Sequence, residues 1–80
     1  MLSELKTVQH VAGLKQTVRA VRNGKAKRVF LARDADPMLT EPLRLLCEER
    51  EIPVAEGHSM RELGEAGGIA VGAAAIAVIG

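Results

Sequence analysis

The sequence predicts a single α/β domain over residues 1–80, with helices on both faces of a sheet of about four strands. The first observation is composition, because 48% of the 80 residues are hydrophobic and Phe30 is the only aromatic one. A core of Val, Ile, Leu and Ala suits a sheet covered by helices. The second is segment order, since short apolar runs at 28–33, 52–55 and 73–79 alternate with segments of helical periodicity.

The N-terminal part of the chain predicts a short helix, a brief strand and a central helix. We expect the first helix over residues 3–8 and the strand over 10–12. The central helix covers about 15–23, because three apolar residues share one of its faces at i, i+4 and i+7: Leu14, Val18 and Val21. Gly24 ends this helix, since glycine adopts the left-handed conformation without steric penalty.

Residues 28–33 form the clearest strand, because consecutive apolar residues indicate that both of its faces are covered. Asp36 is a natural N-cap residue, and Pro37 is a natural first helical residue. We expect Pro42 to divide the following segment into a single turn and a helix that reaches about Arg50.

The C-terminal part predicts one further helix between two strands. A strand at 52–55 lies parallel to the strand before it, so that strand, helix and strand form one crossover unit. Residues 59–62 form a capping box, which begins a short helix that ends at 67–68. Residues 69–72 form a loop, and 73–79 form the last strand.

The net charge of +1 conceals an uneven distribution of charge along the chain. Residues 1–34 carry eight Lys and Arg against two acids, a net charge of +6. Residues 35–80 carry three arginines against eight acids, a net charge of −5. The first half is therefore a candidate docking surface for a polyanion.

The exposed side of the central helix is a row of cations with one amide beside it. Lys15, Arg19 and Arg22 follow helical spacing, and Gln16 lies one turn below Arg19. Lysine in a first turn faces the positive end of the helix dipole, at a cost of about 0.3–1 kcal/mol where exposed. Open N–H groups beside Lys15 and Gln16 suit an anion or a base edge with acceptor atoms. The alternative is an ordinary solvated amphipathic helix.

Catalytic and metal-binding patterns are scarce. The sequence has no nucleophile elbow, Walker loop or His-Glu zinc helix. Cys47 is the only cysteine, and we interpret it as a buried, inert thiol. Asp34 and Asp36 follow a strand, but one is already a helix cap and a magnesium site needs more oxygen ligands. We therefore expect no enzyme, no catalytic residue, no metal and no cofactor.

The hydropathy pattern favours a cytoplasmic protein. No segment reaches the roughly 18 apolar residues of a membrane span. The first residues lack the apolar core of a signal peptide. We therefore expect cytoplasmic localisation and no membrane partner.

Five segments together resemble the L7Ae family of kink-turn RNA-binding ribosomal proteins. They follow the family's order and spacing at 13–19, 32–37, 45–49, 52–53 and 62–69. The match spans about residues 10–79 and is closest to the short bacterial members, which lack the usual final helix.

This resemblance implies a three-layer α-β-α sandwich with a small mixed sheet, which binds the sharply bent duplex of a kink-turn RNA. The helix start contacts tandem sheared G·A pairs, and the loop before the last strand packs against an extruded nucleotide. The RNA-binding residues that it implies are Gly13, Leu14, Lys15, Gln16, Arg19, Asp36, Ile69, Ala70 and Val71. Without the family, the loop at 69–71 is equally well a linker that buries Ile69.

The helix start departs from the longer family members, which have Gly-x-Asn-Glu-x-x-Lys there. Gln16 replaces the glutamate, so a neutral acceptor with two added donors stands where a charged acceptor would be. Lys15 can donate to guanine O6 and N7 or to phosphate, but it cannot accept. Four further cations are candidate phosphate contacts that position RNA without reading its sequence: Arg22, Lys25, Lys27 and Arg28.

The sequence therefore predicts a monomeric, non-catalytic partner of structured RNA, with ribosomal RNA as a candidate. Two alternatives stay open. One is a protein-interaction module in which the apolar loop and the helix meet a protein. The other is a ribosome-associated protein whose RNA is not a kink-turn.

Overall fold

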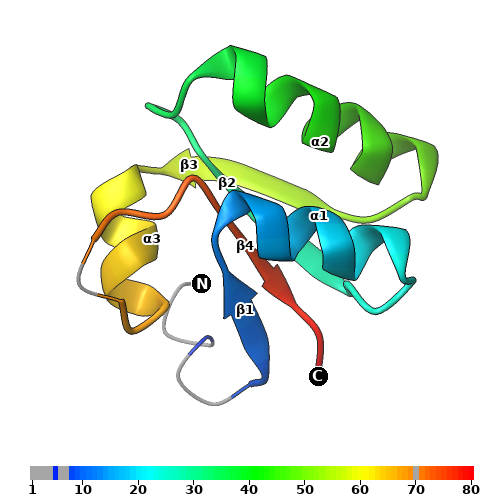
Figure 1. Cartoon of the computed structure of the whole chain (residues 1–80), viewed down its shortest axis with the longest axis horizontal. Coiled ribbons are helices and arrows are strands. Elements are labelled where there is room, and N and C mark those ends of the chain that lie inside the picture. The colour runs from blue at the N-terminus through cyan, green and yellow to red at the C-terminus, as the bar shows by residue number, and fades with distance from the viewer. Residues whose placement is uncertain (1–4, 6–7, 70) are drawn as a thin grey trace.

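A computed structural model of the chain describes residue 5, residues 8–69 and residues 71–80 (Figure 1). The elements in chain order are β1 (His10–Ala12), α1 (Leu14–Arg22), β2 (Arg28–Ala32), α2 (Pro37–Glu49), β3 (Val54–His58), α3 (Met60–Ala66) and β4 (Ala75–Val78). The sheet order is β1-β4-β2-β3. β2 and β3 are parallel, whereas β4 is antiparallel to both of its neighbours, so the sheet is mixed.

Side chains of the central strands alternate between two cores, one on each face of the sheet. On one face, Val29 and Leu31 pack with buried residues of α1 and α2. On the other face, Phe30 and Ile76 pack with Leu63 of α3. The helices therefore form two layers with the sheet between them (Figure 1), which confirms the predicted α-β-α sandwich.

α1 forms where the sequence predicts it, but its buried face is rotated from the predicted one. The buried residues are Thr17, Ala20 and Val21, whereas Leu14 and Val18 are only half-buried at the margin of the core. The small residues of β4 beneath the helix explain the rotation, because Ala75 and Ala77 let small α1 side chains pack closest to the sheet.

α2 differs from the prediction, because it continues through Pro42 without a break. Proline has no N–H for the carbonyl of Met38, which costs one helical hydrogen bond. That carbonyl belongs to an exposed turn, since Met38 is 83% exposed, and water can replace the bond. Leu43 and Cys47 hold the other side of the helix in the core. The N-cap prediction is confirmed, because the Asp36 carboxylate accepts from Met38 N at 3.0 Å.

The two later strands are shifted from their predicted bounds. β3 begins after Pro53, whose carbonyl accepts from Val29 N at 3.0 Å, and it extends through Gly57 to His58. β3 is an edge strand, so it tolerates exposed polar residues that hide the strand pattern in the sequence. β4 is shorter than 73–79, because Ala73 N donates outside the sheet to Met60 O at 3.0 Å.

Three further expectations concern the N-terminus, membranes and metals. The helix expected at 3–8 falls largely outside the described residues. Leu5 is described, and it is buried in the core on the α3 side of the sheet. Among the described helices, none has the length and hydropathy needed to cross a bilayer. Over the same residues, His, Cys, Asp and Glu form no group of three or more that could hold a metal ion.

The start of α3 carries the predicted capping box. Ser59 Oγ accepts from Glu62 N at 3.1 Å, and Glu62 Oε1 accepts from Ser59 N at 3.0 Å. Arg33 donates to the same carboxylate at 3.2 Å. The hydrogen bond from the Ser59 backbone and, after it, those from the Ser59 side chain and Arg33 lower the pKa of Glu62 to about 2.

We predict that Glu62→Gln removes a stabilisation that depends on pH. A carboxylate whose pKa is depressed on folding stabilises the native state above its usual pKa of 4.5, and this contribution is lost as the pH falls toward 2. Glutamine can still accept from Ser59 N, so the variant isolates the charge. Urea unfolding from about pH 6 to about pH 2.5 should show the wild type as more stable at the upper end, with the difference shrinking below 4.5. A constant difference would contradict this.

We predict that Thr17→Val stabilises the protein by about 1 kcal/mol. Thr17 is fully buried, and its Oγ1 has no hydrogen-bond partner among the described residues. Burying an unpaired hydroxyl costs about 1–3 kcal/mol, and valine removes it at nearly constant shape. The free energy of unfolding in urea measures the change. Thr17→Ser, which keeps the hydroxyl and removes the methyl group, should be destabilising instead.

Candidate nucleic-acid interface

The N-terminal tip of α1 is fixed to the first residue of β4. Gly13 N donates to Ala75 O at 2.8 Å, and Gly13 adopts φ 106°, a conformation that side chains with a Cβ rarely adopt. No side chain caps the helix. The N–H groups of its first turn are therefore left for an external acceptor, next to the exposed side chains of Lys15 and Gln16.

The loop from residue 69 to residue 74 leads into the same end of β4. Ile69 N donates to Gly64 O at 3.0 Å, so the loop leaves along α3. Ala32 N donates to Ala74 O at 2.9 Å, so the loop ends beside the end of β2. The predicted loop residues Ile69 and Val71 are 37% and 73% exposed, whereas the predicted contact Ala70 lies outside the described residues.

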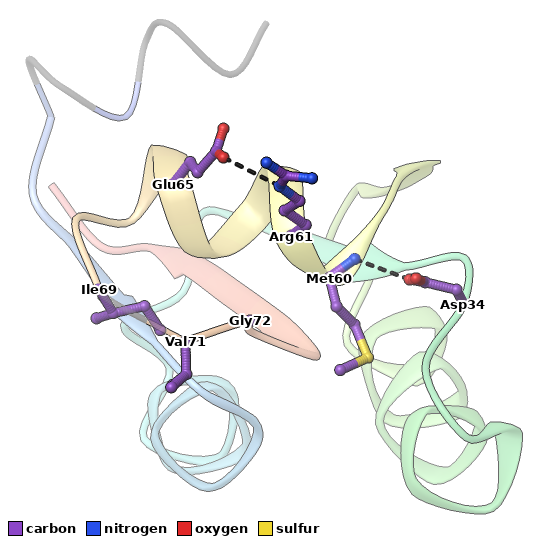
Figure 2. Close-up of a pocket in the computed structure, with 7 residues that line it drawn as sticks. All are labelled: Asp34, Met60, Arg61, Glu65, Ile69, Val71 and Gly72. Carbon is purple, nitrogen blue, oxygen red and sulfur yellow. Dashed lines mark hydrogen bonds and ion pairs between the residues drawn. The ribbon is translucent and has the colours of Figure 1, made fainter.

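The helix tip and the loop therefore meet at the beginning of the central strand β4, although they are about 55 residues apart in sequence. Ala75 is the first residue of β4 and also the acceptor for Gly13. Figure 2 shows the side chain of Val71 pointing away from α3, on the side where the ribbon of α1 lies. Asp36 follows the end of β2, which lies beside the start of β4, and is exposed. Its observed role is the cap of α2, described above.

A cavity of about 530 Å³ opens on the surface beside this loop and α3 (Figure 2). Its lining combines apolar and charged side chains: Asp34, Met60, Arg61, Glu65, Ile69, Val71 and Gly72. Asp34 accepts from Met60 N at 2.8 Å, and Arg61 pairs with Glu65 at 3.4 Å. The sequence analysis did not name Met60 and Arg61 as site residues. Their position could have indicated them, because they begin the helix that leads into the loop.

A glycine of α3 allows the loop to pack directly against the helix. A Cβ at Gly64 would overlap the carbonyl oxygen of Val71 and come within 3.0 Å of Gly72 Cα. Real Cβ atoms do not approach backbone so closely, so a larger residue would displace the loop. Gly64 therefore sets the position of Ile69 and Val71, although the sequence indicated only a helical residue.

Comparison with known proteins now identifies the family. The sequence profile of the Ribosomal protein L7Ae/L30e/S12e/Gadd45 family matches residues 2–80. The chain belongs to this family. A protein named as RNA-binding from Geobacillus sp. (strain WCH70) is 45% identical over 75 residues, covering 94% of this chain and 92% of its own length. A further relative, the RNA-binding protein YbxF of Geobacillus stearothermophilus, is 44% identical over 69 residues, covering 86% of this chain and 84% of its own length.

Solved structures agree with the L7Ae-family assignment. A Bacillus halodurans protein of unknown function superposes with a TM-score of 0.86 at 31% identity, covering 99% of this chain and 83% of its own. The Giardia lamblia 15.5 kD RNA binding protein superposes with a TM-score of 0.83 at 28% identity, covering 99% of this chain and 65% of its own. The resemblance found from five sequence segments is thus confirmed.

This L7Ae-family chain separates the predicted RNA-binding residues into two groups. Lys15, Gln16 and Arg19 are exposed at and just after the tip of α1. Arg22, Lys25 and Lys27 are exposed at the other end of the helix. Lys27 N donates to Val78 O at 2.7 Å, which places it at the end of β4 opposite to Ala75.

Two arginines near the far end of α1 have structural contacts. The predicted phosphate contact Arg28 is half-buried, and its guanidinium lies 5.3 Å from the centroid of the Phe30 ring. Arg50, which sequence reasoning missed, donates to Arg22 O at 3.2 Å and to Val21 O at 3.4 Å. It therefore satisfies carbonyls that the end of a helix leaves open.

We predict that Gly64→Ala destabilises the protein by about 1–3 kcal/mol, because the added methyl group overlaps the loop backbone. The sign is diagnostic, since alanine in an open helical site stabilises by up to about 1 kcal/mol. Urea unfolding measures the stability, and amide chemical shifts of residues 69–73 should move. Gly57→Ala is the control, because a Cβ there meets no atom within 4 Å. Stabilisation by Gly64→Ala would contradict the close packing.

Proposed function

We propose that this L7Ae-family protein binds kink-turn RNA and stabilises the kinked conformer, without catalysing a reaction. The tip of α1 contacts the tandem sheared G·A pairs, and the loop at 69–71 contacts the extruded nucleotide. The observation that carries the proposal is the hydrogen bond from Gly13 N to Ala75 O, which fixes the tip beside the strand that the loop enters. The relatives that are named as RNA-binding proteins support the choice of RNA.

The tip offers complementary chemistry for the edges of the G·A pairs. Gln16 can accept from a guanine N–H with its carbonyl and donate with its amide, and Lys15 can donate to guanine O6 and N7. Arg19 adds a charge one turn later, within reach of a phosphate. The tip is held by a hydrogen bond to the central strand β4, so less conformational entropy is lost on binding.

The loop offers an apolar surface of the kind that an unstacked base requires. Ile69 and Val71 expose aliphatic side chains beside the 530 Å³ cavity, and Gly64 keeps the loop close to α3. A protein with one aromatic residue has little means of stacking many bases, so recognition by shape and by a single extruded nucleotide suits it. Asp36, at the same end of the central strands, can accept a hydrogen bond from that nucleotide.

The two contacts together explain how binding would bend the RNA. Only the kinked conformer presents the G·A pairs and the extruded nucleotide at the spacing of the tip and the loop. The protein therefore has a higher affinity for that conformer and shifts the population toward it. A monomer suffices for this mechanism, and ribosomal RNA in the cytoplasm is the expected partner.

A gel shift compares a kink-turn RNA with the same RNA in which the G·A pairs are replaced by Watson–Crick pairs. We expect clear preference for the kink-turn. Equal, weak binding to both RNAs would instead favour the protein-interaction alternative. Footprinting on ribosomal RNA then separates a kink-turn target from another ribosomal site.

We predict that Gln16→Ala reduces the preference for kink-turn RNA over the disrupted RNA by about 1–3 kcal/mol, because an alanine cannot bond to the base edges. The readout is the ratio of the two Kd values. Gln9→Ala is the matched control, since Gln9 is also exposed and lies at the opposite end of β4, where its carbonyl accepts from Ile79 N. An equal loss of preference in both variants would show that Gln16 does not recognise the G·A pairs.

A further inference from the structure

Three cations at the C-terminal end of α1 have no acidic partner within the described part of the chain: Arg22, Lys25 and Lys27. We name them the distal basic cluster. Three arginines of later segments differ, since Arg33, Arg44 and Arg61 each pair with a glutamate. Unpaired cations on a compact surface attract a polyanion.

The backbone that carries this cluster is held in place by several hydrogen bonds. The turn after α1 folds back, so that Lys25 N donates to Ala20 O at 2.9 Å. Lys27 N is bound to β4, and the Arg50 guanidinium donates to the carbonyl of Arg22. A ligand would therefore order only the side chains of the cluster.

The distal basic cluster lies one helix length away from the tip. α1 runs from residue 14 to residue 22, which is about 12 Å at 1.5 Å per residue. The strand gives a similar value, since Ala75 and Val78 are separated by about 10 Å at 3.3 Å per residue. At the roughly 3 Å rise per base-paired step of an A-form RNA duplex, this distance corresponds to three or four steps.

A continuous surface joins the two ends of α1. A shallow groove of about 420 Å³ follows the helix and is lined by Leu14, Lys15, Val18, Arg19, Arg22 and Asn23. A rigid polyanion that leaves the tip along this groove passes Arg19 and then Arg22. The large exposed hydrophobic residues of the described chain all lie outside residues 14–28, which disfavours a membrane surface as the partner of this helix.

We propose that the distal basic cluster holds the phosphate backbone of an RNA stem that continues three or four steps beyond the kink. This inference rests on the proposed function, because the kink-turn sets where the stem begins. The cluster contributes affinity without reading sequence, whereas the tip supplies selectivity. The protein therefore binds a kink together with its flanking stem.

The test compares the wild type with a variant that carries Arg22→Gln, Lys25→Gln and Lys27→Gln. Each contact with a phosphate contributes about 0.7–0.9 to the slope of log affinity against log salt. Losing three contacts should make this slope less steep by about 2–3. Between 50 and 200 mM salt, the wild type should therefore lose roughly 20- to 40-fold more affinity than the variant. Arg44→Gln is the control for a single charge, because Arg44 is paired with Glu41 and Glu56.

A second measurement locates the contact along the RNA. Kink-turn RNAs that carry one uncharged methylphosphonate linkage each are scanned through both stems. We expect the wild type to lose affinity at linkages three or four steps from the G·A pairs, and the triple variant to be insensitive there. If the triple variant instead became insensitive to uncharged linkages at the G·A pairs, the cluster would belong to the same contact as the tip, and the inference would be overturned.

The outcomes distinguish the inference from the proposed function. A wild type without preference for the kink-turn refutes the proposed function and this inference with it. A wild type that keeps its preference, with an unchanged salt slope in the triple variant, refutes the inference alone. An unchanged RNA slope together with weaker binding to phosphatidylserine vesicles would assign the cluster to a membrane instead.

Discussion

The hydrogen bond between Gly13 N and Ala75 O is the constraint on which the candidate interface depends. It joins the start of α1 to the first residue of β4, and β4 also receives the loop from α3. Because β4 lies between β1 and β2, this junction is in the centre of the sheet rather than at a frayed margin. A helix tip and a loop that are remote in sequence therefore share one rigid support.

The second support of the interface is the close packing of the loop on α3. Gly64 and Gly72 remove the side chains that would separate the two backbones, and Ala73 N bonds to Met60 O. The α3 capping box and the Asp34 carboxylate fix the start of that helix. The close packing and these polar contacts together therefore fix the positions of Ile69 and Val71 relative to α3.

The uneven charge of the sequence becomes a division of surfaces in the fold. The basic first half supplies both ends of α1, whereas the acids of the second half mostly pair with nearby arginines or face solvent on α2 and α3. On the proposed assignment, the two ends of α1 perform different tasks, since one end meets base edges and the other meets phosphates. Helical geometry alone sets their separation.

The sequence by itself determined the layer architecture and the caps at Asp36 and Ser59, because local periodicity and short-range hydrogen bonds decide these features. The order and spacing of five segments indicated the family. The sequence did not determine that α2 continues through Pro42, where the missing hydrogen bond lies on the exposed side of the helix, or that β3 extends along an exposed edge. Only the tertiary structure decided that the tip and the loop meet at the first residue of β4, while Lys27 is bound to its last residue. That arrangement depends on strand order and register, which are set by contacts between distant residues.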